Sequence, residues 1–151
     1  ISLPPCCASR TGACPACRSA LPTCRSLPIA DASFDAALCV LVGEHLDGIS
    51  AVLAELRRVL KRGGRLVFSV YHPEMAAAGI EANFERAGIE YRLGAQPYTL
   101  HHYLAAFAEA GFDGFAYREY RGDASLAADI PAASKYIGRP MLLVIAAAVA
   151  A

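Results

Sequence analysis

The sequence has no surplus of charge of either sign, because 14 Lys and Arg balance 14 Asp and Glu over 151 residues. Proteins that bind nucleic-acid backbones need a surplus of Lys and Arg, so we expect no nucleic-acid partner. The chain also lacks an apolar run of the roughly 20 residues that cross a bilayer. A basic start followed by an apolar stretch, which is typical of a signal peptide, is missing as well. These absences predict a cytoplasmic chain without a membrane partner.

Several catalytic sequence motifs are missing too. The patterns G-x-S-x-G, H-E-x-x-H and the P-loop do not occur, which argues against the common hydrolases, zinc proteases and nucleotide-hydrolysing enzymes. Neither G-x-G-x-x-G nor G-x-G occurs, so no Gly-rich turn is available to approach a nucleotide closely.

Cysteine is absent after residue 39, and five of the six cysteines precede residue 25. Cys14 and Cys17 have the spacing of a zinc knuckle, but a structural zinc site needs four ligands. There is no second C-x-x-C, and the nearest histidine is His45. We therefore predict no metal site, with a zinc-binding appendage as an alternative.

What is present divides the chain in two. Residues 1–26 form a Cys- and Pro-rich lead-in whose first 22 residues show neither the period of a strand nor that of a helix. Residues 27–151 show regular α/β patterning with no internal linker, and we assign them to one partial domain. The abrupt change also fits an out-of-frame stretch of a GC-rich gene joined near residue 25.

The first patterned elements form a strand–helix–strand unit. Residues 34–42 are a short apolar run, typical of a strand buried on both faces. Residues 49–60 have apolar positions at helical spacing, with Asp47 as the expected N-cap and Gly63 as the C-terminal left-handed residue. Residues 65–71 form the second apolar strand, so the unit predicts two parallel strands.

The later elements are predicted in the same way. Residues 74–86 are Ala-rich and favour a helix after Pro73, and residues 89–93 fit a short strand or an ordered loop. Thr99 is expected to cap a helix that ends at Gly111. Two more strands are expected over residues 112–120 and 141–148.

Four stretches resemble one known family. Residues 27–35, LPIADASFD, are similar to the "LPF-(P/A)-D-x-S-F-D" segment of class I S-adenosylmethionine-dependent methyltransferases. Residues 42–46, VGEHL, resemble their "hxEHL" turn after the fourth strand. Residues 55–66, ELRRVLKRGGRL, resemble "E-x-x-R-V-L-K-P-G-G-x-L", with Arg62 in place of proline. The later helix ending AGF, residues 110–112, also matches.

The resemblance implies a Rossmann-like, doubly wound, mostly parallel sheet, of which this chain holds the C-terminal portion. It implies S-adenosylmethionine as the cofactor and a small-molecule methyl acceptor as the substrate. Ligands bind beyond the carboxyl ends of parallel strands in such sheets. The residues implied to lie at the cofactor are Thr23, Cys24, Leu41, Val42, Gly43 and Glu44. The candidate catalytic residues are His45, Tyr71 and His72.

Each candidate residue also has a plain structural interpretation. His45 could act as a general base near neutral pH, or Glu44 and His45 could simply shape the loop. Tyr71 and His72 could contact a substrate or merely end a strand. Three aromatic residues could line an acceptor pocket or pack in the core: Tyr91, Tyr98 and Tyr103. His101 and His102 are expected on a solvated helix face.

The sequence departs from the family in the part that holds the cofactor. The Gly-rich turn after the first strand is not found, nor is the acidic residue after the second strand, and the strands present correspond to the family's fourth to seventh. We therefore expect this chain to bind S-adenosylmethionine weakly or not at all. An alternative is a non-enzymatic partner that associates, with itself or with another chain, through the exposed sheet edge.

Overall fold

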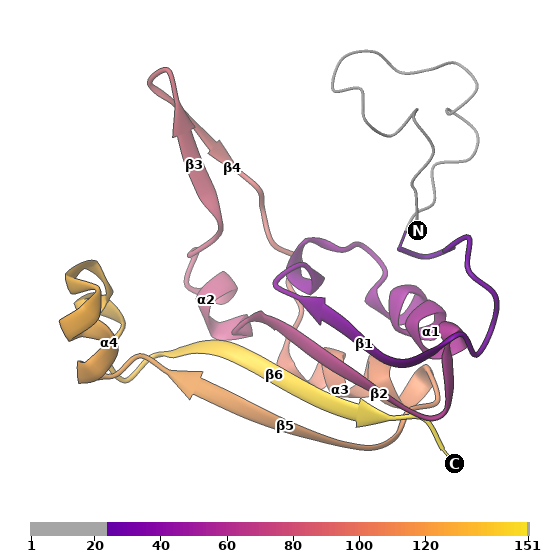
Figure 1. Ribbon diagram of the computed structural model, residues 1–151. Helices are drawn as coiled ribbons and strands as arrows, with labels where there is room; N and C mark the ends of the chain where they lie inside the picture. Colours follow the sequence, from indigo (N-terminus) through magenta and orange to yellow (C-terminus); the bar gives the residue numbers. More distant parts are fainter. Residues whose placement is uncertain (1–23, 151) are drawn as a thin grey trace.

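The computed structural model describes residues 24–150 as an α/β arrangement built on one mixed sheet (Figure 1). The strands are β1 (Phe34–Val40), β2 (Leu60–Tyr71), β3 (Asn83–Arg86), β4 (Ile89–Arg92), β5 (Asp113–Arg121) and β6 (Pro140–Ala148). The helices are α1 (Ile49–Val59), α2 (Pro73–Ala77), α3 (Leu100–Glu109) and α4 (Ala124–Asp129). Two 3-10 turns are η3 (Gly43–His45) and η4 (Pro131–Tyr136).

The main sheet has the order β1-β2-β6-β5. β1 and β2 are parallel, as the strand–helix–strand pattern predicted, and β6 is antiparallel to both of its neighbours, β2 and β5. Three of the four strands therefore run in the same direction, and β6, inserted between β2 and β5, runs against them. The α/β, Rossmann-like fold class predicted from the sequence is confirmed.

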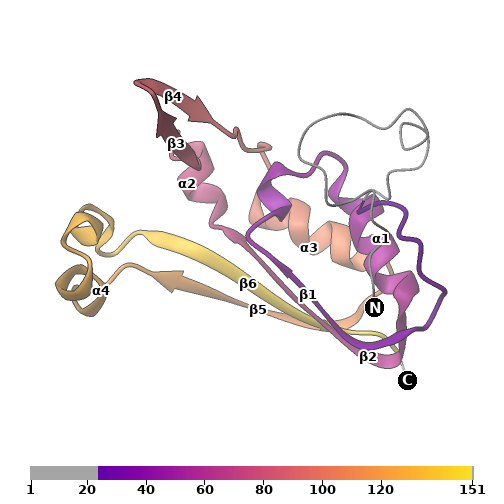
Figure 2. The ribbon, with the colours of Figure 1, turned by 45° about the horizontal axis from the view of Figure 1, so that its top comes forward.

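Helices α1 and α3 pack side by side on one face of the sheet (Figure 2). Alternate residues of β2 point toward them, so Leu66, Phe68 and Val70 are fully buried. The ring of Phe68 lies 5.6 Å from the rings of both Tyr103 and Phe107 on α3, measured between centroids. This aromatic cluster is the centre of the hydrophobic core and fixes α3 against the strand ends.

The opposite face of the sheet is uncovered among the described residues (Figure 2). Leu38 and Val40 of β1 are 74% and 54% exposed, and Val67 of β2 is 37% exposed. These residues alternate with the buried ones because side chains of a strand point to opposite faces. The part of the chain that the structure describes thus carries one of the two helical layers of a doubly wound sheet.

The predicted helix over residues 74–86 is wrong beyond Ala77. Gly79 adopts a left-handed conformation (φ 71°), which ends α2, and residues 83–86 form β3 instead. β3 pairs with β4, with Phe84 opposite Tyr91 and their rings stacked at 4.9 Å. This hairpin projects away from the main sheet (Figure 1), so cross-strand stacking rather than helix propensity decides its structure.

The start of α1 also differs from the prediction. The N-cap is Gly48, in a left-handed conformation, and not Asp47. The hydroxyl of Tyr98 accepts hydrogen bonds from the backbone N–H groups of Gly48 (3.1 Å) and Ile49 (3.4 Å). Tyr98, which is 50 residues from Gly48 in sequence, therefore accepts the N-terminal hydrogen bonds of α1 that the side chain of Asp47 was expected to accept. Gly63 is left-handed as predicted but lies within β2.

Among residues 24–150, the structure holds no helix of the length and apolarity that crossing a membrane requires.

Candidate functional site

The carboxyl end of β1 leads into a tight turn at residues 41–45. Leu41 has a positive φ of 51°, which is unusual for a branched residue, and its N–H donates to the carbonyl of Ser69 on β2 (2.8 Å). Gly43 follows because a side chain has no room there: a Cβ would lie 2.3 Å from Cζ of Phe68 and 2.7 Å from Cγ1 of Val70. Such strain is typical of functional sites.

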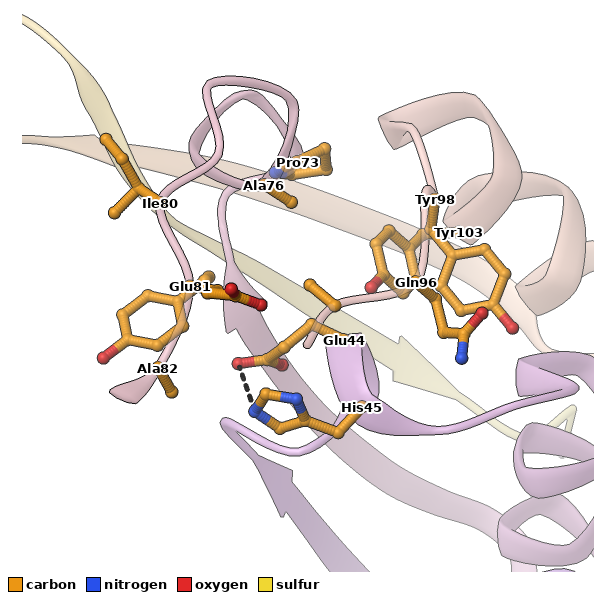
Figure 3. Close-up of a pocket in the computed structure, with 12 residues that line it drawn as sticks. Glu44, His45, Pro73, Ala76, Ile80, Glu81, Ala82, Gln96, Tyr98 and Tyr103 are labelled. Carbon is orange, nitrogen blue, oxygen red and sulfur yellow. Dashed lines mark ion pairs between the residues drawn. The ribbon is translucent and has the colours of Figure 1, made fainter. Parts of the chain in front are cut away.

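The next two residues point into a pocket beside this turn (Figure 3). Glu44 is buried, with 4% of its surface exposed, and neither carboxylate oxygen has a hydrogen-bond partner among the described residues. His45 donates from Nδ1 to the carbonyl of Gly94 (2.6 Å), which turns Nε2 toward Glu44 Oε1 at 3.9 Å. Glu44 is therefore a buried carboxyl group without a hydrogen-bond donor, because the imidazole at 3.9 Å is too distant to supply one.

The carboxyl end of β2 contributes Tyr71 and His72. His72 is buried, and its Nδ1 accepts a hydrogen bond from the N–H of Glu74, which caps α2. Its Nε2 therefore carries the proton and faces Glu119 Oε1 of β5 at 3.1 Å. Tyr71 is 40% exposed. His72 thus has a structural role as a helix cap and pairs with Glu119, and both residues line the adjacent cavity.

Two adjacent cavities lie around α2. The smaller, with a volume of about 10 Å³, has room for one water-sized group. Its lining includes Glu44, His45, Tyr71, Glu81, Gln96, Tyr98 and Tyr103 (Figure 3). The larger, of about 440 Å³, is lined by His72, Glu74, Tyr98, Leu100 and Glu119 among others. A volume of this size accommodates a small organic molecule.

Burial and the charge of Glu44 affect the neighbouring titratable groups. Burial, and after it the carboxylate of Glu44, raises the pKa of the Tyr103 hydroxyl well above its ordinary value. Burial also raises the pKa of the Cys39 thiol to about 11, with smaller contributions from Cys24 and Glu44. Both groups are therefore neutral at physiological pH, and neither provides a nucleophile or a base.

A polar network that the motif spacing did not reveal connects two of the family-like stretches. Arg58 donates to the carbonyl of Ile29 (2.8 Å), to the carboxylate of Asp31 and to Oε1 of Glu55 (2.7 Å). Glu55 in turn accepts from the N–H of Leu27 (2.6 Å). The hydrogen bonds from Arg58, and then that from Leu27, lower the pKa of Glu55 from 4.5 to about 2. This network holds residues 27–31 on α1.

The structure brings together only some of the candidate residues. Glu44, His45 and Tyr71 line the smaller cavity, and His72 lines the larger one. Leu41 and Val42 are 45% and 38% exposed at the strand end. Cys24 is exposed, while Thr23, like the rest of the lead-in before residue 24, lies outside the described residues.

Other pocket residues were missed or left open by sequence reasoning. Tyr98 and Tyr103 line the smaller cavity, whereas Tyr91 stacks on Phe84 in the hairpin. Glu81 and Gln96 could not be predicted from the sequence, because they lie in irregular stretches, where the spacing of residues does not indicate which way a side chain points. No group of three or more His, Cys, Asp or Glu side chains within residues 24–150 is arranged to hold a metal ion.

Comparison with known proteins relates the chain to one group of enzymes. Residues 7–68 match the model of a family described as a methyltransferase domain. The match begins inside the range 1–26, so the boundary at residue 27 stays a prediction. Sterol 24-C-methyltransferase ERG6B of Gibberella zeae is 35% identical over 92 residues, which are 58% of this chain and 24% of that protein. The chain thus spans about a quarter of that relative's length.

Solved structures share the fold. An S-adenosylmethionine-dependent methyltransferase from Mesorhizobium loti superposes with a TM-score of 0.65 at 20% identity, over 83% of this chain and 67% of that one. Phosphoethanolamine N-methyltransferase 2 of Haemonchus contortus, solved with S-adenosyl-L-methionine, gives 0.57 at 10% identity, over 85% and 36%. The shared fold and the sequence match over residues 7–68 make this chain similar to S-adenosylmethionine-dependent methyltransferases over a part of their length.

Proposed function

We propose that the chain acts in S-adenosylmethionine-dependent methyl transfer to a small molecule and supplies the acceptor side of the site. The observation that supports this most directly is the position of the cavities. They lie where the parallel strands β1 and β2 end, which is where ligands bind in open α/β sheets. Cytoplasmic location stays a prediction.

The residues present fit part of the cofactor. Leu41 and Val42 are exposed at the end of β1, and the strained backbone at Leu41 and the side-chain-free Gly43 allow close approach of a ligand. These residues, with the backbone of Glu44, would lie beside the methionine part, while the side chain of Glu44 lines the smaller cavity. When bound, S-adenosylmethionine supplies an electrophilic methyl group on its sulfonium. For the ribose and adenine the sequence offers only Thr23 and Cys24, without a Gly-rich turn.

Within this site, our proposal assigns different tasks to the candidate residues. His45 is placed to take up a proton at Nε2 because its Nδ1–H is held by Gly94. His72 orients α2 and, paired with Glu119, borders the larger cavity, while Tyr71 borders the smaller one. The acceptor would enter through the larger cavity. Holding the two reactants in line is the main contribution that a protein makes to such a transfer.

Binding measurements on the purified chain test this proposal. In a titration of the ¹⁵N-labelled chain with S-adenosylmethionine, we expect amide shifts at residues 41–44 and a dissociation constant of about 1 mM, about 4 kcal/mol of binding free energy. Absence of shifts at these amides at 10 mM, roughly ten such dissociation constants, would overturn the proposal. Micromolar affinity in isothermal titration calorimetry would instead contradict the partial cofactor site.

A second candidate function is that of a binding partner. Among residues 24–150, β1 pairs with β2 alone and forms an edge of the sheet. Its outer side chains Leu38 and Val40 are exposed. An apolar edge strand is a template for pairing with another chain, and we propose self-association through β1 as the alternative to be tested.

A further inference from the structure

Glu44 presents an unusual chemical situation at the smaller cavity. Its side chain is more than nine-tenths buried, and both of its carboxylate oxygens lack a hydrogen-bond donor among residues 24–150. The imidazole Nε2 of His45 lies 3.9 Å from Glu44 Oε1, beyond hydrogen-bond reach. Burying an unpaired carboxylate is strongly unfavourable. The residue therefore destabilises the folded chain unless something else pairs with it.

The charge of the surrounding walls is of one sign. The two cavities are lined by four carboxylates, from Glu44, Glu74, Glu81 and Glu119, and no Lys or Arg lines either of them in the part of the chain that the structure describes. Glu81 is paired with Arg92 at 3.5 Å, and Glu119 with His72 and Arg121. Glu44 and Glu74 have no Lys or Arg partner among the described residues, and of these two only Glu44 is buried. This lining favours a positively charged ligand.

The size of the cavities limits that ligand further. About 10 Å³ beside Glu44 is enough for one water-sized group, which a primary ammonium group matches and a trimethylammonium group exceeds. The two cavities share Pro73, Ala76, Ala95, Gln96 and Tyr98 in their walls, so they are adjacent. The larger one offers about 440 Å³ with apolar walls for the remainder of the molecule.

We propose that the smaller cavity binds the ammonium group of a primary amine, with Glu44 as its counterion and the apolar body of the amine in the larger cavity. This inference rests on the proposed function, in which the amine is the methyl acceptor or bears it. The carboxylate gives the ammonium a charge-assisted hydrogen bond, and the ring of Tyr98 borders both cavities beside it.

An ammonium group also occurs in the methionine part of S-adenosylmethionine. The residues expected beside that part, Leu41 and Val42, line neither cavity. Glu44 instead points into the smaller cavity, with its carboxylate on the side of Glu81 and His45 (Figure 3). The geometry thus favours the acceptor as the source of the ammonium, and the experiment includes an arm for the cofactor.

The test compares ligands that differ in the charged group alone. The chain 1–151 and its Glu44→Gln variant are titrated by NMR with 2-phenylethylamine, its N,N,N-trimethyl analogue and 2-phenylethanol. We expect Glu44→Gln to weaken binding of the primary amine at least tenfold and to leave that of the alcohol within twofold. The quaternary analogue should bind the unmodified chain at least tenfold more weakly than the primary amine. Glu85→Gln, on the exposed strand β3, removes the same charge far from the cavities and should change nothing.

Stability separates a binding role from a structural one. Because Glu44 is buried without a donor, Glu44→Gln should leave the urea midpoint unchanged or raise it. A lower midpoint together with unchanged amine binding would overturn the proposal, as would equal binding of the primary and quaternary ligands. S-adenosylhomocysteine, which carries the methionine ammonium without the sulfonium, is titrated as a further ligand. If Glu44→Gln weakened binding of S-adenosylhomocysteine tenfold and left binding of the primary amine unchanged, the ammonium site would belong to the cofactor and its assignment to the acceptor would be overturned.

The two proposals fail separately. If amine binding depends on Glu44 but S-adenosylmethionine causes no amide shifts at residues 41–44, the proposed ammonium site is supported and the proposed role in methyl transfer is contradicted. If S-adenosylmethionine causes these shifts but the amine does not bind, the role in methyl transfer is supported and the ammonium site is contradicted.

Discussion

Gly43 shows how one residue fixes the geometry of the turn after β1. It lies against the ring of Phe68 and the methyl groups of Val70, at distances that a Cβ atom cannot occupy. The close approach places the 3-10 turn η3 directly on the core and aims Glu44 into the pocket. The requirement for glycine here is steric, because its φ is not in the left-handed range.

Replacing Gly43 by alanine should lower the free energy of unfolding by about 1–3 kcal/mol, the usual cost of overpacking a core, as measured by urea denaturation. The same variant should lose the NMR response of Glu44 to the amine probe because the turn is displaced.

A double-mutant cycle with Phe68→Leu identifies the cause. Removing the ring atom that clashes should relieve part of the penalty, so the double variant should be more stable than the sum of the two single effects by about 1 kcal/mol. If the effects of the two substitutions on the free energy of unfolding were strictly additive, the contact with the Phe68 ring would not be the cause of the destabilisation by Gly43→Ala.

Between elements, the network of Glu55 and Arg58 connects α1 to the stretch that leads into β1. Leu27 and Ile29 contribute backbone groups to it, and Asp31 contributes a carboxylate. The family-like stretches 27–35 and 55–66 are therefore two halves of one contact. Within this network, Glu55 is the group whose pKa shift, from 4.5 to about 2, falls in a pH range that can be tested by unfolding experiments.

The pKa of Glu55 is lowered from 4.5 to about 2 in the folded chain, so its ionised form stabilises the fold above pH 4.5. This contribution is lost as the pH falls from about 4.5 to about 2. We expect Glu55→Gln to be less stable than the unmodified chain at pH 7 and the difference to shrink through that window. Urea titrations at pH 7, 5, 4 and 3 measure it.

Asp129→Asn, at the exposed end of α4, serves as the control and should give a difference that does not change with pH. A constant difference for Glu55→Gln as well would show that the variant acts through packing instead of through the ionised carboxylate.

How much of each element could be predicted depended on where its determinants lie. Thr99 caps α3 as predicted because cap and helix are neighbours in sequence, and His102 completes the capping box. The helix predicted for the Ala-rich stretch after Pro73 was wrong beyond Ala77, because residues 83–86 pair with Ile89–Arg92 and this pairing overrides helix propensity. Glu44 was predicted as a site residue from the turn it occupies, but its lack of a partner depends on α2 and on residues 95–98, which no local pattern places.

At the scale of the whole molecule, the sheet face and the edge of β1 that no other residue of 24–150 covers lie together. Leu38 and Val40 on the edge strand and Val67 beside them form an exposed apolar surface of the kind that mediates association. We expect the chain to form dimers or larger species as the protein concentration rises. Size-exclusion chromatography with light scattering should detect them.

Leu38→Lys should shift that equilibrium toward the monomer because it places a charge on the edge strand. Leu93→Lys makes the same change at a 60% exposed position after the β3–β4 hairpin and should leave it unaltered. A clean monomer of the unmodified chain at all concentrations would contradict association through β1.

The position of β6 has a consequence for how the chain is made. This strand follows β5 in the sequence and is the last of the described elements, yet it lies between β2 and β5 and forms antiparallel pairs with both. On the ribosome, β5 is complete well before its partner emerges, and its backbone donors have no strand to bind in the interval. The main sheet therefore closes only after residues 140–148 leave the exit tunnel, and until then the nascent chain exposes β5 and one edge of β2 to other strands.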